Sequence, residues 1–252
     1  MPGTSEPHIT VSNVAIGFGD RVLLEQLDFE VMRGEIFVIL GGSGCGKSTL
    51  MRHMIGFDEP LQGEIRVDGE PPRVGSGMPG FGVLFQAGAL FGSMTLGQNV
   101  ALPLETWTDL SRADVAEVVR SKLRLVGLGG FENHLPAELS GGMKKRAGIA
   151  RALALDPPLV FLDEPGAGLD PITSVELDEL ILTLSRNLGT TLVIVTHELA
   201  SIFAIGHRCV MLDREAKGMI ALGDPRELRD HSTHPTVAAF FNRRVPEGGV
   251  RA

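Results

Sequence analysis

Two kinds of apolar pattern along the chain predict two kinds of β-strand. Apolar and polar residues alternate in segments 9–11, 27–31 and 64–69, as in an antiparallel sheet with one solvated face. Segments 37–40, 159–162 and 192–195 are instead continuous apolar runs flanked by helical patterns, which indicates buried parallel strands. The pattern therefore predicts an α/β protein with a parallel core sheet and an N-terminal antiparallel sheet.

Residues 94–155 carry a helical pattern that predicts an inserted helical subdomain. A start signal at Leu110 and Ser111 precedes apolar residues at helical spacing, namely Val115, Val118, Val119, Leu123 and Val126. Ser140 is expected to cap a second amphipathic helix, whose apolar positions are Met143, Ala147, Ala150 and Ala154. The glycine-rich stretch 71–82 is expected to be a loop or linker.

Composition and charge narrow the class of protein. The chain has 252 residues and 43% hydrophobic content, enough for a substantial core. Its net charge of −8 argues against nucleic-acid binding, and the single basic cluster at residues 144–146 is interpreted as a solvated or phosphate-steering face. The sequence has no membrane-spanning run and no signal-peptide pattern, which predicts a cytoplasmic protein whose Cys45 and Cys209 stay reduced.

Residues 36–49 have the sequence form of a triphosphate-binding loop. An apolar strand leads into G-x-x-x-x-G-K-[ST], spanning Gly41, Gly42, Ser43, Gly44, Cys45, Gly46, Lys47, Ser48 and Thr49. Glycine allows the tight curl that brings backbone N–H groups onto phosphate oxygens, while the Ser43 and Cys45 side chains act only as spacers. Lys47 is expected to reach the β- and γ-phosphates and Ser48 to ligate Mg²⁺, at a helix that starts near Gly46.

A second buried strand, residues 159–162, ends in Asp163 and Glu164. The end of a parallel strand is where an α/β sheet presents residues to a ligand. Downstream of a phosphate loop, Asp163 is expected to hold Mg²⁺ through water and Glu164 to polarise the attacking water. Two acids at a strand end are also compatible with ordinary turn residues.

The order of the motifs is more specific than any one of them. Ser140-Gly141-Gly142 alone is most often an ordinary turn. The phosphate loop, Gln86, residues 139–142, residues 162–165 and Thr196-His197 occur in an order that resembles the nucleotide-binding subunit of an ABC transporter, over about residues 8–228. The resemblance implies a P-loop NTPase of the ABC ATPase fold over residues 8–230, with a RecA-like core, followed by a tail at residues 231–252.

The resemblance also assigns roles by position. It implies that Phe18 stacks on adenine, Gln86 contacts Mg²⁺ and the lytic water, Asp170 lies on a dimer-contact loop, and His197 holds the γ-phosphate. Taken singly, Phe18 is more often a core residue, and His197 a residue that ends a strand.

The same helix start predicts that the subunit works in pairs. Ser140, Gly141 and Gly142 form an anion site that has no phosphate loop near it in sequence, so they are expected to serve ATP bound by a second copy. ATP binding then closes the dimer and hydrolysis lets it reopen.

Three local features look like the ATPase subunit of Mla-type, Mce-associated phospholipid transport systems. They are Met143 in place of the usual glutamine, residues 87–91 and residues 170–173. The implied partners are a membrane permease docking near residues 86–100, an Mce-type lipid-binding protein and a small STAS-domain regulator. The subunit would lie peripherally on the cytoplasmic side of the inner membrane, with the Phe240-Phe241 patch contacting the second subunit or the regulator.

Three other interpretations stay open at this point. Met143 can reflect neutral drift in an importer for another substrate, since fold and site chemistry do not set the cargo. An ABC-type ATPase acting on cell-division or other non-transport machinery fits the same site. A P-loop kinase fits the phosphate loop but leaves residues 140–142 and His197 without a role.

Overall fold

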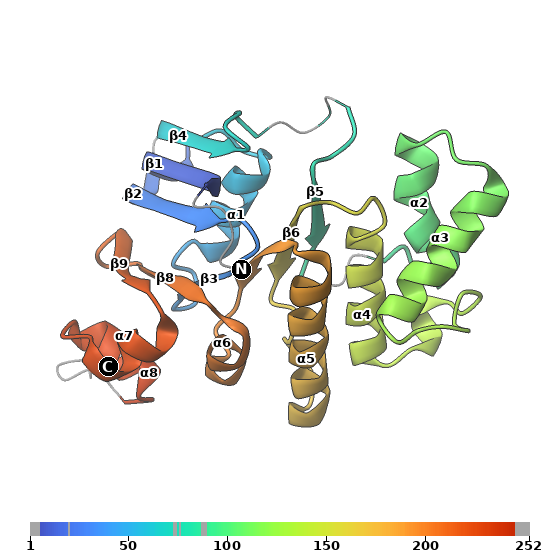
Figure 1. Cartoon of the computed structure of the whole chain (residues 1–252). Coiled ribbons are helices and arrows are strands. Elements are labelled where there is room, and N and C mark those ends of the chain that lie inside the picture. Colours follow the sequence, from blue (N-terminus) through green and yellow to red (C-terminus); the bar gives the residue numbers. More distant parts are fainter. Residues whose placement is uncertain (1–5, 20, 73–74, 76, 87–89, 245–252) are drawn as a thin grey trace. The chain divides into compact units, whose positions relative to one another are not determined.

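The computed structural model describes residues 6–19, 21–72, 75, 77–86 and 90–244. The chain divides into two compact units. The first unit combines residues 1–74 with 195–252, and the second consists of residues 75–194 (Figure 1).

An antiparallel sheet in the first unit confirms the predicted alternating strands. Its order is β2 (Arg21–Met32), β1 (Pro7–Phe18), β4 (Gln62–Val67). Val11 pairs with Phe29 on one side and Ile65 on the other, and all three side chains are buried. The strands begin and end at other residues than predicted, and β4 stops at Val67 because Asp68 and Gly69 adopt positive φ in a turn.

The first unit also contains the strand that precedes the glycine loop. β3 (Ile36–Gly41) is buried at every position, as predicted, and pairs in parallel with β8 (Arg208–Asp213). β9 (Gly218–Gly223) is antiparallel to β8. The helices of this unit are α1 (Lys47–Ile55), α6 (Leu199–Ile205), α7 (Pro225–His231) and α8 (Pro235–Phe241).

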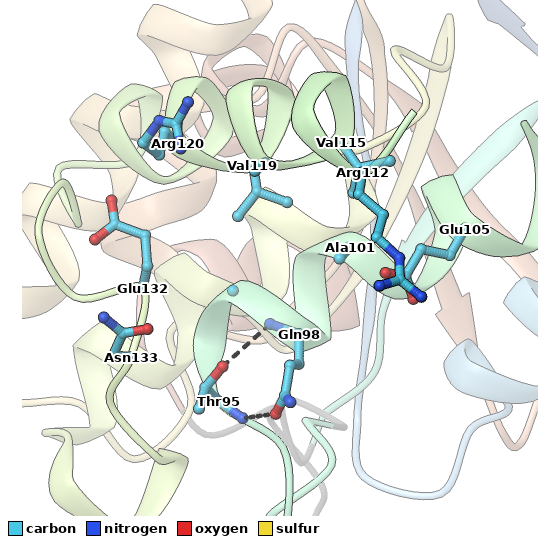
Figure 2. Close-up of a pocket in the computed structure, with 12 residues that line it drawn as sticks. Thr95, Gln98, Ala101, Glu105, Arg112, Val115, Val119, Arg120, Glu132 and Asn133 are labelled. Atoms are coloured by element: carbon cyan, nitrogen blue, oxygen red, sulfur yellow. Dashed lines mark hydrogen bonds between the residues drawn. The ribbon is translucent and has the colours of Figure 1, made fainter. Parts of the chain in front are cut away.

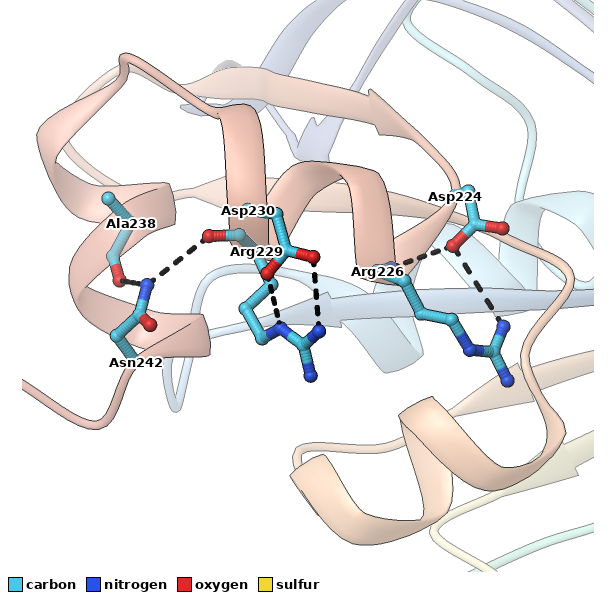
Figure 3. Close-up of polar contacts among 6 residues, drawn as sticks. All are labelled: Asp224, Arg226, Arg229, Asp230, Ala238 and Asn242. Carbon is cyan, nitrogen blue, oxygen red and sulfur yellow. Dashed lines mark hydrogen bonds and ion pairs between the residues drawn. The ribbon is translucent and has the colours of Figure 1, made fainter.

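The last two helices are integrated into the first unit. Val237 and Phe241 are buried in a cluster with side chains of β3 and β8, namely Val38, Leu40, Cys209 and Met211. Asp224 caps α7 by accepting a 2.7 Å hydrogen bond from the Arg226 backbone N–H, and the Asn242 side-chain amide donates to the Arg229 and Ala238 carbonyls (Figure 3). The hypothesis of a Phe240-Phe241 contact patch is therefore wrong for Phe241, which is only 3% exposed.

Three strands of the second unit lie in the order β5 (Phe81–Leu84), β6 (Leu159–Asp163), β7 (Thr191–Val195), and α5 (Pro171–Leu188) follows β6. β5 and β6 are parallel, with Leu84 opposite Leu162. The predicted loop over residues 71–82 is wrong at its end, because Phe81 and Gly82 belong to β5. A Cβ on Gly82 would lie 2.0 Å from the Ala152 carbonyl oxygen, so this glycine permits close packing rather than a turn.

The predicted helical segment contains α2 (Leu96–Trp107), α3 (Arg112–Leu125), a 3₁₀ turn η1 (Pro136–Glu138) and α4 (Gly141–Ala152), which pack together (Figure 1). Ser111 and Ser140 cap α3 and α4, as expected from their side-chain chemistry. Val126 and Ala154 lie beyond the ends of these helices, yet both are buried.

A pocket of about 510 Å³ lies beside α2 and α3 (Figure 2). At its edge, Thr95 and Gln98 exchange hydrogen bonds of 2.8 and 3.2 Å in a capping box that begins α2. Arg112, Arg120 and Glu132 also line the pocket. None of the residues predicted to bind nucleotide lines it.

Candidate functional site

The glycine loop between β3 and α1 has the tight curl that its sequence predicts. Gly41, Gly44 and Gly46 have φ values of 146°, 73° and 107°, in the region that disfavours side chains. A Cβ on Gly41 would lie only 2.3 Å from the Leu212 carbonyl oxygen of β8. The loop conformation therefore depends on glycine both for its dihedral angles and for its close approach to β8.

The loop presents groups suited to a polyanion. The Lys47 ammonium donates to the carbonyls of Gly41 and Gly42, at 2.9 and 3.1 Å, which holds the charge over the loop. Gly46 begins α1 without a side-chain cap, so the positive end of the helix is not covered by a neighbouring carboxylate or hydroxyl cap. Residues 42–44 and Ser48 are exposed. A ligand with several phosphate oxygens fits this arrangement.

Both cysteines are free thiols in buried positions. Burial raises the pKa of Cys45, which lies inside the loop, and raises the pKa of Cys209 to about 12. At neutral pH both are therefore protonated, and Cys45 serves as a packed spacer and not as a nucleophile.

Phe18 and His197 also belong to the first unit. Phe18 ends β1 with 63% of its surface exposed, so its ring is available to a flat ligand. His197 is exposed and follows Thr196, whose backbone N–H donates to the Ile39 carbonyl of β3 at 3.3 Å. The structure thus places His197 beside the strand that leads into the glycine loop.

The second unit brings together Gln86, Asp163 and Glu164. Gln86 is exposed and lies two residues after β5, while Asp163 ends the neighbouring β6 and Glu164 follows it. Because β5 and β6 are parallel, these residues share one edge of the strand pair. Asp163 and Glu164 are 7% and 8% exposed, and Glu164 has a φ of 47°, unusual for a residue with a side chain.

Lys145 contacts the backbones of both Gln86 and Glu164, and the sequence analysis did not predict a role for it. Its ammonium donates to the Gln86 carbonyl at 2.7 Å and to the Glu164 carbonyl at 3.0 Å. The interpretation of residues 144–146 as a solvated face is therefore wrong for Lys145, which is buried, whereas Arg146 is half-buried and pairs with the exposed Glu176. Its burial could have been predicted from helical spacing, because Lys145 lies on the same buried face of α4 as Gly142 and Ile149.

The Leu139–Gly142 motif starts α4 as expected. Ser140 is exposed and accepts a 3.3 Å hydrogen bond from the Met143 backbone. Gly141 is exposed, whereas a Cβ on Gly142 would lie 2.4 Å from the Thr173 methyl group of α5. Gly142 therefore permits the packing of α4 on α5, and Ser140 and Gly141 form the accessible part of the helix start.

Asp170 has a local structural role. Its carboxylate caps α5 by accepting hydrogen bonds from the Ile172 and Thr173 backbones at 3.1 Å and from the Thr173 hydroxyl. These bonds hold the pKa of Asp170 below its usual value. Of the loop that supported the phospholipid resemblance, residues 87–89 lie outside the described residues, while Leu90 and Phe91 are described.

The available metal ligands suit a cation that is shared with a nucleotide. Within the described ranges, no group of three or more His, Cys, Asp or Glu side chains could hold a metal by itself. Mg²⁺ bound to nucleotide phosphates needs only one or two protein ligands and keeps several waters. The Ser48 hydroxyl and the Asp163 carboxylate are hard oxygen donors of the kind that it prefers.

Comparisons with known proteins agree with this set of motifs. Residues 24–167 match the ABC transporter family. The chain is 40% identical over 242 residues to the probable ribonucleotide transport ATP-binding protein mkl of Mycobacterium leprae (strain TN), covering 94% of this chain and 69% of the relative. It is 38% identical over 231 residues to the intermembrane phospholipid transport system ATP-binding protein MlaF of Escherichia coli (strain K12), covering 86% of each.

A solved structure shows the same fold. The dimeric post-hydrolysis state of the ATP-binding cassette MJ0796, bound to ADP and Pi, has a TM-score of 0.75 and 28% identity, over 86% of this chain and 98% of that chain. The predicted ABC ATPase fold is confirmed, and with it nucleotide binding and ATP hydrolysis. The chain belongs to the ABC transporter family, as one of its ATP-binding ATPases.

Proposed function

We propose that this ATPase energises phospholipid transport through a membrane permease. The observation that carries the proposal is the similarity to MlaF, a phospholipid transport ATP-binding protein, over 86% of both chains. Met143, directly after the Leu139–Gly142 motif, supports it as one of the three local features that resemble this branch of the family. Transport of ribonucleotides is a second candidate, because of the similarity to mkl.

The catalytic roles follow the chemistry of the described side chains. Lys47 and the loop backbone bind the phosphates, the Phe18 ring stacks on the base, and His197 donates to the γ-phosphate. Gln86 orients the attacking water, and the Glu164 carboxylate accepts a hydrogen bond from it. Ser48, Gln86 and a water on Asp163 would hold Mg²⁺, which when bound would supply positive charge against the phosphates.

The start of α4 acts on a second copy of the chain. Ser140 has an exposed hydroxyl and Gly141 an exposed backbone at a helix N-terminus, which suits a phosphate. We expect them to contact ATP bound by the partner copy, so that ATP closes the dimer. The dimeric form of the similar ATP-binding cassette supports this arrangement.

Replacing Lys47 with methionine is expected to weaken ATP binding. The ammonium now bonds to two neutral carbonyls and would exchange them for charge-assisted bonds to phosphate. Losing such bonds costs about 1.5–3 kcal/mol, or roughly 10- to 150-fold in Kd for ATP. Fluorescent ATP-analogue titration measures this change. Ser43→Ala, at an exposed spacer of the same loop, should bind as wild type, and unchanged binding by Lys47→Met would contradict the role of Lys47.

An apolar groove in the second unit offers a docking site for the permease. It measures about 330 Å³ and is lined by side chains of β5, α2 and α4 together with Phe91. Phe91 and Trp107 are 51% and 39% exposed, and large exposed aromatic side chains are typical of interface anchors. Phe91 belongs to the predicted docking segment, residues 86–100.

The double variant Phe91→Ser, Trp107→Ala should lose the permease in co-purification while ATP affinity is unchanged. Removing two anchors of this kind costs about 2 kcal/mol or more each. Leu188→Ser, at an exposed apolar residue of α5, is the control and should retain the permease. Full recovery of the permease with the double variant would rule out this groove as its docking site.

Purification of the tagged chain from membranes, followed by identification of its protein and lipid partners, tests the transported substrate. A lipid-type permease with bound phospholipid and an Mce-type protein, with or without a STAS-domain regulator, would support the proposal. A permease that releases ribonucleotides would favour the second candidate. A cell-division membrane protein, or no membrane protein, would contradict phospholipid transport and leave the ATPase chemistry intact.

The proposed location is peripheral, on the cytoplasmic side of the inner membrane, where a permease can be reached. Among the helices of the described residues, none combines the length and apolar character of a membrane span. In this proposal the permease attaches the chain to the membrane, so loss of the permease gene should release the chain from the membrane fraction.

A further inference from the structure

Lys145 is a buried cation that has no part in the roles proposed so far. It is the fifth residue of α4, one turn beyond the Ser140 cap, and is 8% exposed. Burying an ammonium is costly unless several oxygens accept its hydrogen bonds. A lysine at this position therefore requires a specific set of acceptors.

Two of those acceptors are the backbone carbonyls of Gln86 and Glu164, at 2.7 and 3.0 Å. The two residues are 78 positions apart in the sequence, follow different strands, and are joined through one ammonium. Both are residues whose side chains are proposed to act on the attacking water. The contact is to their backbones, so it fixes the chain that carries each side chain and not the side chain itself.

Glu164 needs such support. Its φ of 47° is in the left-handed region, where a residue with a side chain is held only if its surroundings impose the conformation. The Lys145 bond to its carbonyl restrains the peptide unit that follows this angle. Gln86 lies two residues beyond β5, and the Lys145 bond to its carbonyl restrains its backbone there.

We infer that Lys145 is a positioning residue for ATP hydrolysis, which holds the Gln86 and Glu164 backbones in the geometry that aligns the attacking water. The inference rests on the roles proposed above for those two side chains. It also gives α4 a second function, because the helix that begins at Ser140 then supports its own chain's catalytic residues. A misplacement of about 1 Å at a reacting group is enough to cost a large part of the rate.

The test is steady-state ATP hydrolysis by the full chain, in the complex purified through a tag on it. Lys145→Met keeps the length of the side chain and removes the charge and all donors, and kcat is expected to fall about 10-fold with KM for ATP unchanged. Lys145→Arg, which restores charged donors, should regain most of the lost kcat. Lys144→Met, at the neighbouring half-buried lysine, is the matched control and should resemble wild type.

The outcomes separate this inference from the proposed function. Wild-type kcat in Lys145→Met, or a loss shared equally by Lys145→Arg, would overturn the positioning role while an inactive Glu164→Gln leaves the proposed function standing. Undiminished turnover in Glu164→Gln would overturn the proposed roles themselves. If Lys145→Met does not fold, Lys145→Gln replaces it. Its amide is uncharged and its side chain is one bond shorter, so it should hold the two carbonyls only in part and lower kcat to an intermediate value, and a kcat equal to wild type would again overturn the inference.

Discussion

Replacing Glu164 with glutamine is expected to lower the rate of ATP hydrolysis by about 100-fold or more, the range that a general base contributes. The amide has nearly the shape of the carboxylate, so the buried site at the end of β6 can retain its packing. The amide cannot take up a proton from the attacking water, and it polarises that water less than the carboxylate does. ATP affinity should stay near the wild-type value, because the phosphate loop is unchanged.

The variant should also accumulate a closed dimer in the presence of ATP. If closure needs ATP and reopening needs hydrolysis, blocking hydrolysis leaves the closed form as the end point. Size-exclusion chromatography with and without ATP measures this change, alongside phosphate release. Glu117→Gln, at an exposed residue of α3, is the control and should hydrolyse ATP at the wild-type rate. Undiminished turnover in Glu164→Gln would contradict the assignment of Glu164.

Motifs whose function depends on local backbone shape were predictable from the sequence. The glycines at 41, 44 and 46 have the positive φ values that a curled phosphate loop needs, and Ser140 caps the helix that it was expected to cap. The buried strands β3 and β6 followed from continuous apolar runs. In each case the sequence signal lies within a few consecutive residues.

Features that depend on distant partners were not predictable in the same way. Lys145 reads as one of three consecutive basic residues, and only the positions of Gln86 and Glu164 show that it is buried between two carbonyls. Gly82 reads as part of a loop, although it is a strand residue kept small by the Ala152 carbonyl.

The packing of residues 231–244, the described part of the tail, was likewise not predictable from the sequence. Residues 237–241 form an isolated apolar patch in the sequence, which suggested a contact surface for another protein. In the structure the partners of Val237 and Phe241 are β3 and β8, far away along the chain. A short apolar segment near a terminus can therefore either bind another protein or pack into the core of its own chain, and only the fold decides between the two.

Phe241→Ala is expected to lower the free energy of unfolding of the first unit by about 3–5 kcal/mol, the usual cost of removing a buried phenylalanine. Phe241 packs against Phe203 with ring centroids 5.7 Å apart and shares a cluster with Val38 and Leu40 of β3. Its loss leaves a cavity behind the strand that carries the phosphate loop. Denaturant unfolding, monitored by circular dichroism, measures the change, and truncation after Asp230 should destabilise at least as much.

Phe18→Ala is the matched control, since Phe18 is 63% exposed and its removal should change stability by no more than about 0.5 kcal/mol. The two interpretations of the tail, core packing and binding to another protein, predict opposite effects of Phe241→Ala on stability. If α8 is part of the core, Phe241→Ala lowers stability while ATP-dependent dimer formation persists below the unfolding transition. If the tail instead binds another protein, stability stays at the wild-type value while dimer or regulator binding is lost, which would contradict the packing of α8 against β3 and β8.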